Sequence, residues 1–142
     1  MTVERICGNE VYLARGDESA QVAGKRMQEH NVGMLVVVVD DDRQPVGIVT
    51  DRDLAIRVVG TGLDPMEVRI DQIMSGRPKT VPIDTPIEDA LDMMRHHGVR
   101  RLPVLDRSGK LTGVISLDDV LKQLANELKE ASALLDRSQP RR

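Results

Sequence analysis

GVISLDDV, residues 113–120, is the stretch that decides the fold, because it ends a strand and begins a helix within a few residues. Gly113 to Ile115 form the end of an apolar extended segment, and Ser116 stands where a helix N-cap is favoured. An earlier stretch, GIVTDRDL (residues 47–54), shows the same pattern 66 positions before it. The chain therefore contains an internal repeat.

The repeat runs through most of the chain. A step of 67 positions relates residues 84–90 to residues 17–23, and Val99 to Val32. The shorter step near the end of each half indicates one extra residue near 40–43, in a predicted hairpin turn. Each half predicts the order short strand, helix, strand, strand, helix. Neither half alone buries much core, so we expect two sheets packed in one pseudo-symmetric unit.

Local signals place the elements. In the second half, residues 85–88 read as a capping box with proline at the first helical position, and Gly98 ends that helix. Strands are expected at 101–105 and 111–115. In the first half, strands are expected near 34–39 and 46–49, and helices near 19–30 and 51–59. We assign residues 1–64 to repeat 1 with its connecting segment, 65–127 to repeat 2, and 128–142 to a helical extension that frays from residue 136.

Composition excludes several classes of protein. The 142 residues carry a net charge of -3, so no basic field favours nucleic acid or an anionic membrane. Tyr12 is the single aromatic residue, which argues against base-stacking nucleic-acid binders. No apolar run has the length of a membrane span, and no signal-peptide core is visible. With Cys7 as the only cysteine, an intramolecular disulfide is impossible, and a cytoplasmic location is expected.

The blocks at 47–54, 99–104 and 113–120, together with the tandem arrangement, resemble CBS domains, the regulatory module named after cystathionine β-synthase. The resemblance covers residues 3–127, and the run from 50 to 74 is similar to small stand-alone bacterial CBS-pair proteins. It implies an α+β (α/β-like) fold of two β-α-β-β-α repeats packed as a pseudo-two-fold pair with two clefts. It also implies a non-catalytic regulatory module that binds AMP, ADP or ATP, or in some members S-adenosylmethionine or NADH. Two such units commonly form a homodimer.

A Ser/Thr-x-x-Asp motif occurs in both halves, as Ser116 with Asp119 and as Thr50 with Asp53. At a strand-to-helix turn, unpaired backbone N–H groups favour phosphate, and the hydroxyl can donate to a phosphate oxygen. The two carboxylate oxygens of the aspartate suit the paired hydroxyls of a ribose. The same pattern is also an ordinary helix cap, and both roles can coexist.

Further candidates surround the second motif. Arg101 and Arg100 can neutralise phosphate, and Thr80, Val81 and Val99 match the family's positions that contact adenine. The first half has Gly33 and Met34 in place of the two arginines. Arg52 can compensate for the positive charge that is missing there. We therefore expect the Ser116–Asp119 site to be the better equipped, although which half serves which cleft is not readable from sequence.

Other functions have weaker support. His96 and His97 are adjacent and diverge around a helix, and His30 and His97 occupy matching helix ends, so a capping or dipole role is favoured over metal binding. The acidic residues 40–42 read as a solvated turn. No nucleophile–base pair or phosphate loop indicates an enzyme, and no cofactor is required. The main alternative is a structural module that dimerises or docks on a regulated partner through its long final helix.

Overall fold

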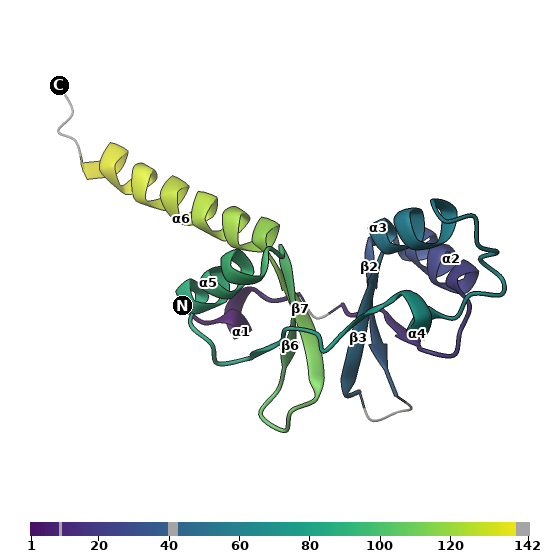
Figure 1. The fold of residues 1–142 in the computed structure, drawn as a ribbon. Coiled ribbons are helices and arrows are strands. Elements are labelled where there is room, and N and C mark those ends of the chain that lie inside the picture. The colour runs from purple at the N-terminus through teal and green to yellow at the C-terminus, as the bar shows by residue number, and fades with distance from the viewer. Residues whose placement is uncertain (9, 40–42, 139–142) are drawn as a thin grey trace.

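The computed structural model describes residues 1–8, 10–39 and 43–138, and it shows a mixed α+β fold with two sheets. The two sheets lie side by side in the middle of the molecule, and the helices of each repeat cover the outer side of its own sheet (Figure 1). This arrangement confirms the predicted pair of β-α-β-β-α repeats.

The two repeats contain matching elements. The first has β1 (Leu13–Arg15), α2 (Ala20–His30), β2 (Met34–Val38), β3 (Pro45–Thr50) and α3 (Asp51–Leu54), which continues as the π-helical turn η2 (Ala55–Val59). The second has β5 (Val81–Pro82), α5 (Ile87–His97), β6 (Arg101–Leu105), β7 (Leu111–Ser116) and α6 (Leu117–Ser138). The predicted order of elements is therefore confirmed in both halves.

The strand registers are equivalent as well. β1 lies parallel to β2 and β2 antiparallel to β3, while β5, β6 and β7 repeat this pattern. Met34 pairs with Thr50 in the first sheet, and Arg101 pairs with Ser116 in the second. Both central hairpins carry a register shift at the same place, after Val37 and after Val104. The pseudo-two-fold symmetry thus extends to single residues.

The segment that leads into each repeat packs against the other repeat. Val3 of α1 (Val3–Ile6) is buried in the core of the second repeat, whereas Ile70 and Ile73 of α4 (Ile70–Ile73) are buried in the core of the first. Gly8 bridges to Val114 of β7, and β4 (Ser75–Gly76) pairs with β3 in the equivalent way. Each sheet is therefore completed by a segment from the neighbouring repeat.

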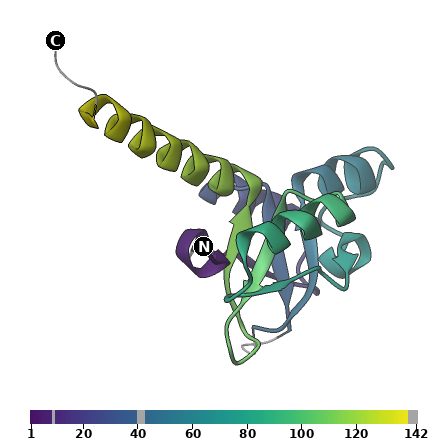
Figure 2. The same cartoon turned by 90° about the vertical axis from the view of Figure 1, so that its left-hand side faces the viewer.

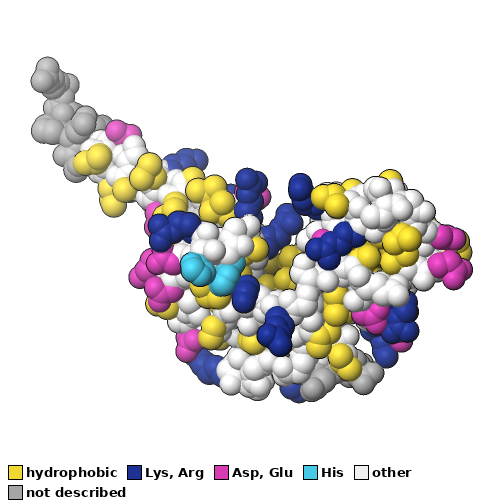
Figure 3. Space-filling model, in the orientation of Figure 1, with side chains coloured by type: hydrophobic (Ala, Val, Ile, Leu, Met, Phe, Trp, Pro, Cys, Tyr) yellow, Lys and Arg dark blue, Asp and Glu magenta, His cyan; other side chains and the backbone are white. Residues whose placement is uncertain are grey.

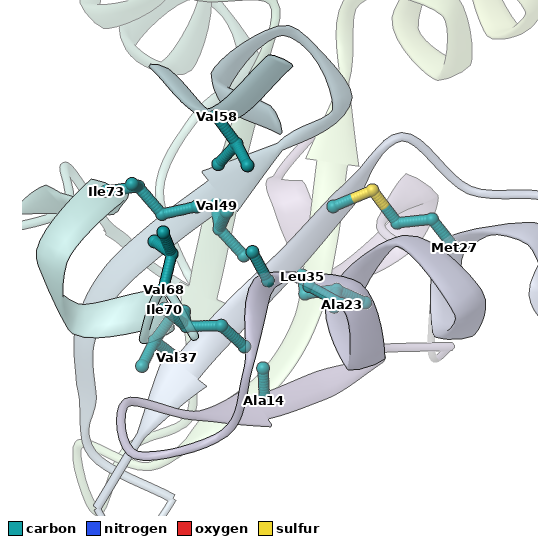
Figure 4. Close-up of a cluster of buried hydrophobic side chains, with 11 residues drawn as sticks. Ala14, Ala23, Met27, Leu35, Val37, Val49, Val58, Val68, Ile70 and Ile73 are labelled. Carbon is teal, nitrogen blue, oxygen red and sulfur yellow. The ribbon is translucent and has the colours of Figure 1, made fainter. Parts of the chain in front are cut away.

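Three apolar clusters hold the molecule together. One fills the first repeat between its sheet and helices (Figure 4), and a second fills the other repeat. The third joins the sheets of the two repeats through Val36, Val38 and Leu111. Residues 35 and 37 face the first cluster and residues 36 and 38 face the third, which explains the unbroken apolar run of β2.

Two local predictions were wrong. The expected capping box at residues 85–88 does not form, since Pro86 is the N-cap of α5 and no side chain caps that helix. The amide of Ile87 donates instead to the carbonyl oxygen of Met1, at 3.1 Å, so the N-terminal segment supplies the acceptor. The final helix continues to Ser138, beyond residue 136 where fraying was expected, and it projects from the body (Figure 2). The rest of the predicted frayed tail, residues 139–142, lies outside the described residues.

Two other expectations concern the acidic turn and the membrane. The predicted turn at Asp40, Asp41 and Asp42 lies outside the described residues. Within the described part of the chain, no helix combines the length and the apolar character that crossing a membrane requires.

Candidate functional site

Two cavities lie between the repeats, and they occupy pseudo-symmetric positions. The space-filling view shows a hollow between the two halves with Lys and Arg side chains gathered around it (Figure 3). We call the larger cavity, of about 320 Å³, the Thr50 cleft, and the smaller one, of about 190 Å³, the Tyr12 cleft. Both are built where a strand of one repeat meets the leading segment of the other.

The Thr50 cleft combines the end of β3 with the segment that precedes β5. Thr50 comes from the first repeat, whereas Arg77, Lys79, Val99 and Arg101 come from the second. The side chains of Arg77, Lys79 and Arg101 are all exposed to the cleft or to solvent. None of the described residues that line it is acidic, so this lining carries a net positive charge.

The Tyr12 cleft is the counterpart on the other side of the pseudo-two-fold axis. Its lining includes Glu10, Tyr12 and Met34 of the first repeat, and Arg101 and Val114 of the second. The Tyr12 ring stacks on that of His30, with 4.1 Å between the centroids, and its hydroxyl donates to a Glu10 carboxylate oxygen at 3.3 Å. Partial desolvation and the nearby Glu10 charge raise the pKa of Tyr12 above its ordinary value.

The two Ser/Thr-x-x-Asp motifs both act as helix caps. The Thr50 hydroxyl accepts from the Asp53 amide at 3.1 Å, and the Asp53 carboxylate accepts from the Thr50 amide at 2.9 Å, which forms a capping box. The Ser116 hydroxyl accepts from the Asp119 amide at 3.0 Å. The predicted caps at Thr50 and Ser116 are therefore confirmed.

The two aspartates differ in what they contact. The second oxygen of Asp53 lies 3.7 Å from Arg57 Nε, and the Asp53 side chain is only 15% exposed. The Asp119 carboxylate accepts no hydrogen bond from the residues that the structure describes. Asp119 is thus the freer of the two carboxylates to accept hydrogen bonds from a ligand.

The structure brings some predicted site residues together and separates others. Thr50, Val99 and Arg101 line one cavity, and Arg101 also lines the other. Ser116 and Asp119 follow Val114, which lines the Tyr12 cleft. The other predicted residues, Ser116 and Asp119 included, do not line either cavity among the described residues: Arg52, Asp53, Thr80, Val81, Arg100, Ser116, Asp119. Of these, Val81 is fully buried in the core of the second repeat, so it does not face a ligand.

Sequence reasoning missed several residues that line the clefts. Arg77, Lys79 and His97 line the Thr50 cleft, and Glu10 and Tyr12 line the Tyr12 cleft. The internal repeat could have indicated them, because its 67-residue step relates Arg77 to Glu10 and Lys79 to Tyr12. These pairs lie just before the short strand of each repeat, beside the predicted site residue Thr80 in the second repeat.

The surroundings of His97 in the Thr50 cleft shift its pKa. Partial desolvation lowers the pKa of His97, and the nearby charges of Lys79 and His96 lower it further. The negative end of the α5 dipole would act in the opposite direction, so the expected dipole role is not the dominant influence on this residue. Burial raises the pKa of the Cys7 thiol, which packs against the second core. No cluster of three potential metal ligands occurs among the described residues.

Comparison with known proteins gives a consistent result. The chain is 37% identical over 122 residues to an uncharacterised protein of Methanopyrus kandleri, covering 86% of this chain and 62% of that protein, so it spans less than two thirds of that relative. A solved structure of a putative signal-transduction protein with CBS domains from Burkholderia ambifaria superposes with a TM-score of 0.79 at 34% identity, covering 87% of this chain and 93% of that one.

A second solved structure, a CBS domain protein from Pyrobaculum aerophilum complexed with AMP, superposes with a TM-score of 0.77 at 25% identity and covers 89% of this chain and 99% of that one. The family model of the CBS domain matches twice, at residues 3–60 and at residues 70–126. Both matches coincide with the two repeats of the fold. The chain therefore belongs to the CBS domain family, and its two CBS domains form one CBS pair.

Proposed function

We propose that this CBS pair is a regulatory, non-catalytic module that binds an adenine nucleotide, AMP, ADP or ATP, in the clefts between its repeats. The observation that carries the proposal is the placement of Arg101 at both clefts, each of which lies beside a Ser/Thr-x-x-Asp helix start. The likeness to a CBS domain protein complexed with AMP supports the same ligand class.

The chemistry of the clefts suits a nucleotide. Cationic side chains neutralise phosphate, and Asp119 offers two carboxylate oxygens for ribose hydroxyls. Apolar side chains such as Val99 and Val114 can contact the faces of an adenine ring. The volume of the Thr50 cleft, about 320 Å³, is at the lower end of the range of about 300–1,000 Å³ that is typical of small-molecule sites.

A thermal-unfolding screen with AMP, ADP, ATP, S-adenosylmethionine and NADH tests the proposal. A ligand that binds only the folded state stabilises it by about 2.7 kcal/mol at 100 times its dissociation constant. We expect a clear stabilisation by at least one adenine nucleotide, with no turnover of that nucleotide by chromatography. Stabilisation by S-adenosylmethionine or NADH alone would reassign the ligand, and no response to any compound at millimolar concentration would contradict nucleotide binding.

The second candidate function is a structural module, and α6 is the observation that favours it. Its leucines Leu121, Leu124 and Leu128 are 53%, 48% and 76% exposed. Together with Ala131 and Leu135 they alternate at three and four residues, the spacing of a coiled coil. We propose that this face packs against a second copy of the chain in a homodimer.

Light scattering coupled to size exclusion separates the two candidates. We expect a dimer for the unmodified chain and a monomer for Leu128→Glu, with Lys129→Glu as the control on the same helix. A dimer that does not respond to nucleotides would support the structural module alone. A monomer at all concentrations would exclude the homodimer and leave nucleotide binding to be judged separately.

A further inference from the structure

The two clefts form a matched pair inside one molecule, which makes their differences informative. Apolar lining residues are exchanged for apolar ones across the pseudo-two-fold axis, as Val99 for Val32 and Pro78 for Val11. The apolar parts of the two linings are thus alike in chemical character, although the Thr50 cleft is the larger. The charges of the two linings are not alike.

Three positions carry the difference in charge. Arg77, Lys79 and Arg101 of the second repeat correspond to Glu10, Tyr12 and Met34 of the first. All three second-repeat residues line the Thr50 cleft, where no described lining residue is acidic. The Tyr12 cleft has the carboxylate of Glu10, and among the described residues that line it Arg101, from the other repeat, is the one cation.

The cations of the Thr50 cleft are available to a ligand. Arg77, Lys79 and Arg101 make no ion pair with another described residue, in contrast to Arg26, which is held by Glu18 at 2.7 Å. Arg77 also has a φ of 50°, in the left-handed region that a non-glycine residue seldom adopts. Such backbone conformations are found more often at functional sites than elsewhere.

His97 lines this cleft together with Lys79, and its pKa is lowered first by desolvation and then by the charge of Lys79. Lys79 contributes to the shift, so His97 and Lys79 are close enough to interact. A polyphosphate placed beside them relieves this repulsion, whereas an uncharged nucleoside does not.

We propose that the Thr50 cleft selects nucleotides with a phosphate chain, ADP and ATP, over uncharged adenosine, through Arg77 and Lys79 acting with Arg101. The Tyr12 cleft has Glu10, Tyr12 and Met34 at the positions of these three cations and shares only Arg101, so it is suited to an adenosine ligand of low charge. This inference rests on the proposed nucleotide-binding function and specifies the ligand class of each cleft.

Calorimetric titrations of the full chain with ATP and with adenosine test the inference. Each charge-assisted contact contributes about tenfold or more in affinity, so we expect the Thr50 cleft to bind ATP at least about a hundredfold more tightly than it binds adenosine. The ATP affinity should fall as salt is raised, whereas the adenosine affinity should not. This salt comparison needs no substitution and is therefore independent of how well a variant folds.

Replacing a cation of the Thr50 cleft by the residue at the equivalent position of the first repeat tests which side chains cause the preference for ATP. Arg77→Glu and Lys79→Tyr should each lower the ratio of ATP to adenosine affinity by about tenfold or more. Lys129→Glu on α6 makes the same charge change as Arg77→Glu outside the clefts, and it should leave the ratio within about twofold.

The possible failures are distinguishable. Equal affinities for ATP and adenosine, or ratios unchanged in both variants, would overturn the inference while the proposed nucleotide-binding function stands. Failure of both ATP and adenosine to bind the unmodified chain would overturn the inference, and the screen with AMP and ADP then decides whether the proposed function survives.

Discussion

Gly113→Ala tests the packing of the segment that leads into each repeat against the other repeat, the arrangement that builds the two clefts. Gly113 lies on β7 where the N-terminal segment crosses, and a Cβ at this position would collide with the carbonyl oxygen of Gly8 and approach Cys7 Sγ to 3.4 Å. Gly8 and Val114 exchange two backbone hydrogen bonds here, of 3.0 and 3.2 Å. The collision is with backbone, so a side-chain rotation cannot relieve it.

The expected magnitude follows from these contacts. Two hydrogen bonds contribute about 0.5–1.5 kcal/mol each, and overpacking of a close contact costs about 1–3 kcal/mol. Because the contributions overlap, we expect a loss of about 2–4 kcal/mol in the free energy of unfolding. Urea unfolding measures it as a lower midpoint with an unchanged slope.

Gly76→Ala is the matched control, because Gly76 lies on the equivalent crossing strand β4 and a Cβ there meets no atom within 4 Å. Its free energy of unfolding should change by less than about 0.5 kcal/mol. Equal stabilities for the two variants would refute the idea that the crossing at Gly8 holds the N-terminal segment on the second repeat.

Three further predictions concern the clefts. Asp53→Ala should lower the free energy of unfolding by about 1 kcal/mol because it removes the capping box. Asp119→Ala should lower the free energy of unfolding by less and should instead weaken nucleotide binding. Urea unfolding with and without AMP measures both effects. Since Arg101 lines both clefts, ATP bound in one cleft should lower the affinity of the other cleft for a phosphorylated ligand about tenfold. Calorimetry should show that this coupling vanishes in Arg101→Met. Phosphate near Lys79, Arg77 and Arg101 should raise the lowered pKa of His97, so ATP affinity should rise as the pH falls through the interval between the bound and the free pKa of His97. An NMR titration that finds the same His97 pKa with and without ATP would contradict this.

Local signals were sufficient to predict the repeat elements. Gly98 ends α5 in the left-handed conformation as expected, and Ser116 and Thr50 cap their helices. These features depend on a few neighbouring residues, so a single sequence contains the information. The failed capping box at Pro86 shows the limit, because its acceptor came from Met1, far away in sequence.

The composition of the clefts depends on this long-range exchange. The sequence alone suggested that Arg101 belongs with Ser116 because both lie in the second repeat. The structure places Arg101 opposite Ser116 in the sheet, yet also in the cleft of Thr50. Nothing in a local pattern indicates that residues 77–79 face Thr50, since that requires knowing how the two sheets pack.

Mapping of backbone amide NMR signals during titration with ATP tests the central claim most directly. Nucleotide binding between the repeats predicts saturable shifts at Thr50, Val99 and Arg101, with smaller effects at Val114. The groove between α2 and η2, which includes Gly24 and Val59, serves as an internal reference and should not respond. Shifts confined to that groove, or no shifts at millimolar ATP, would contradict the assignment of the clefts as the nucleotide site.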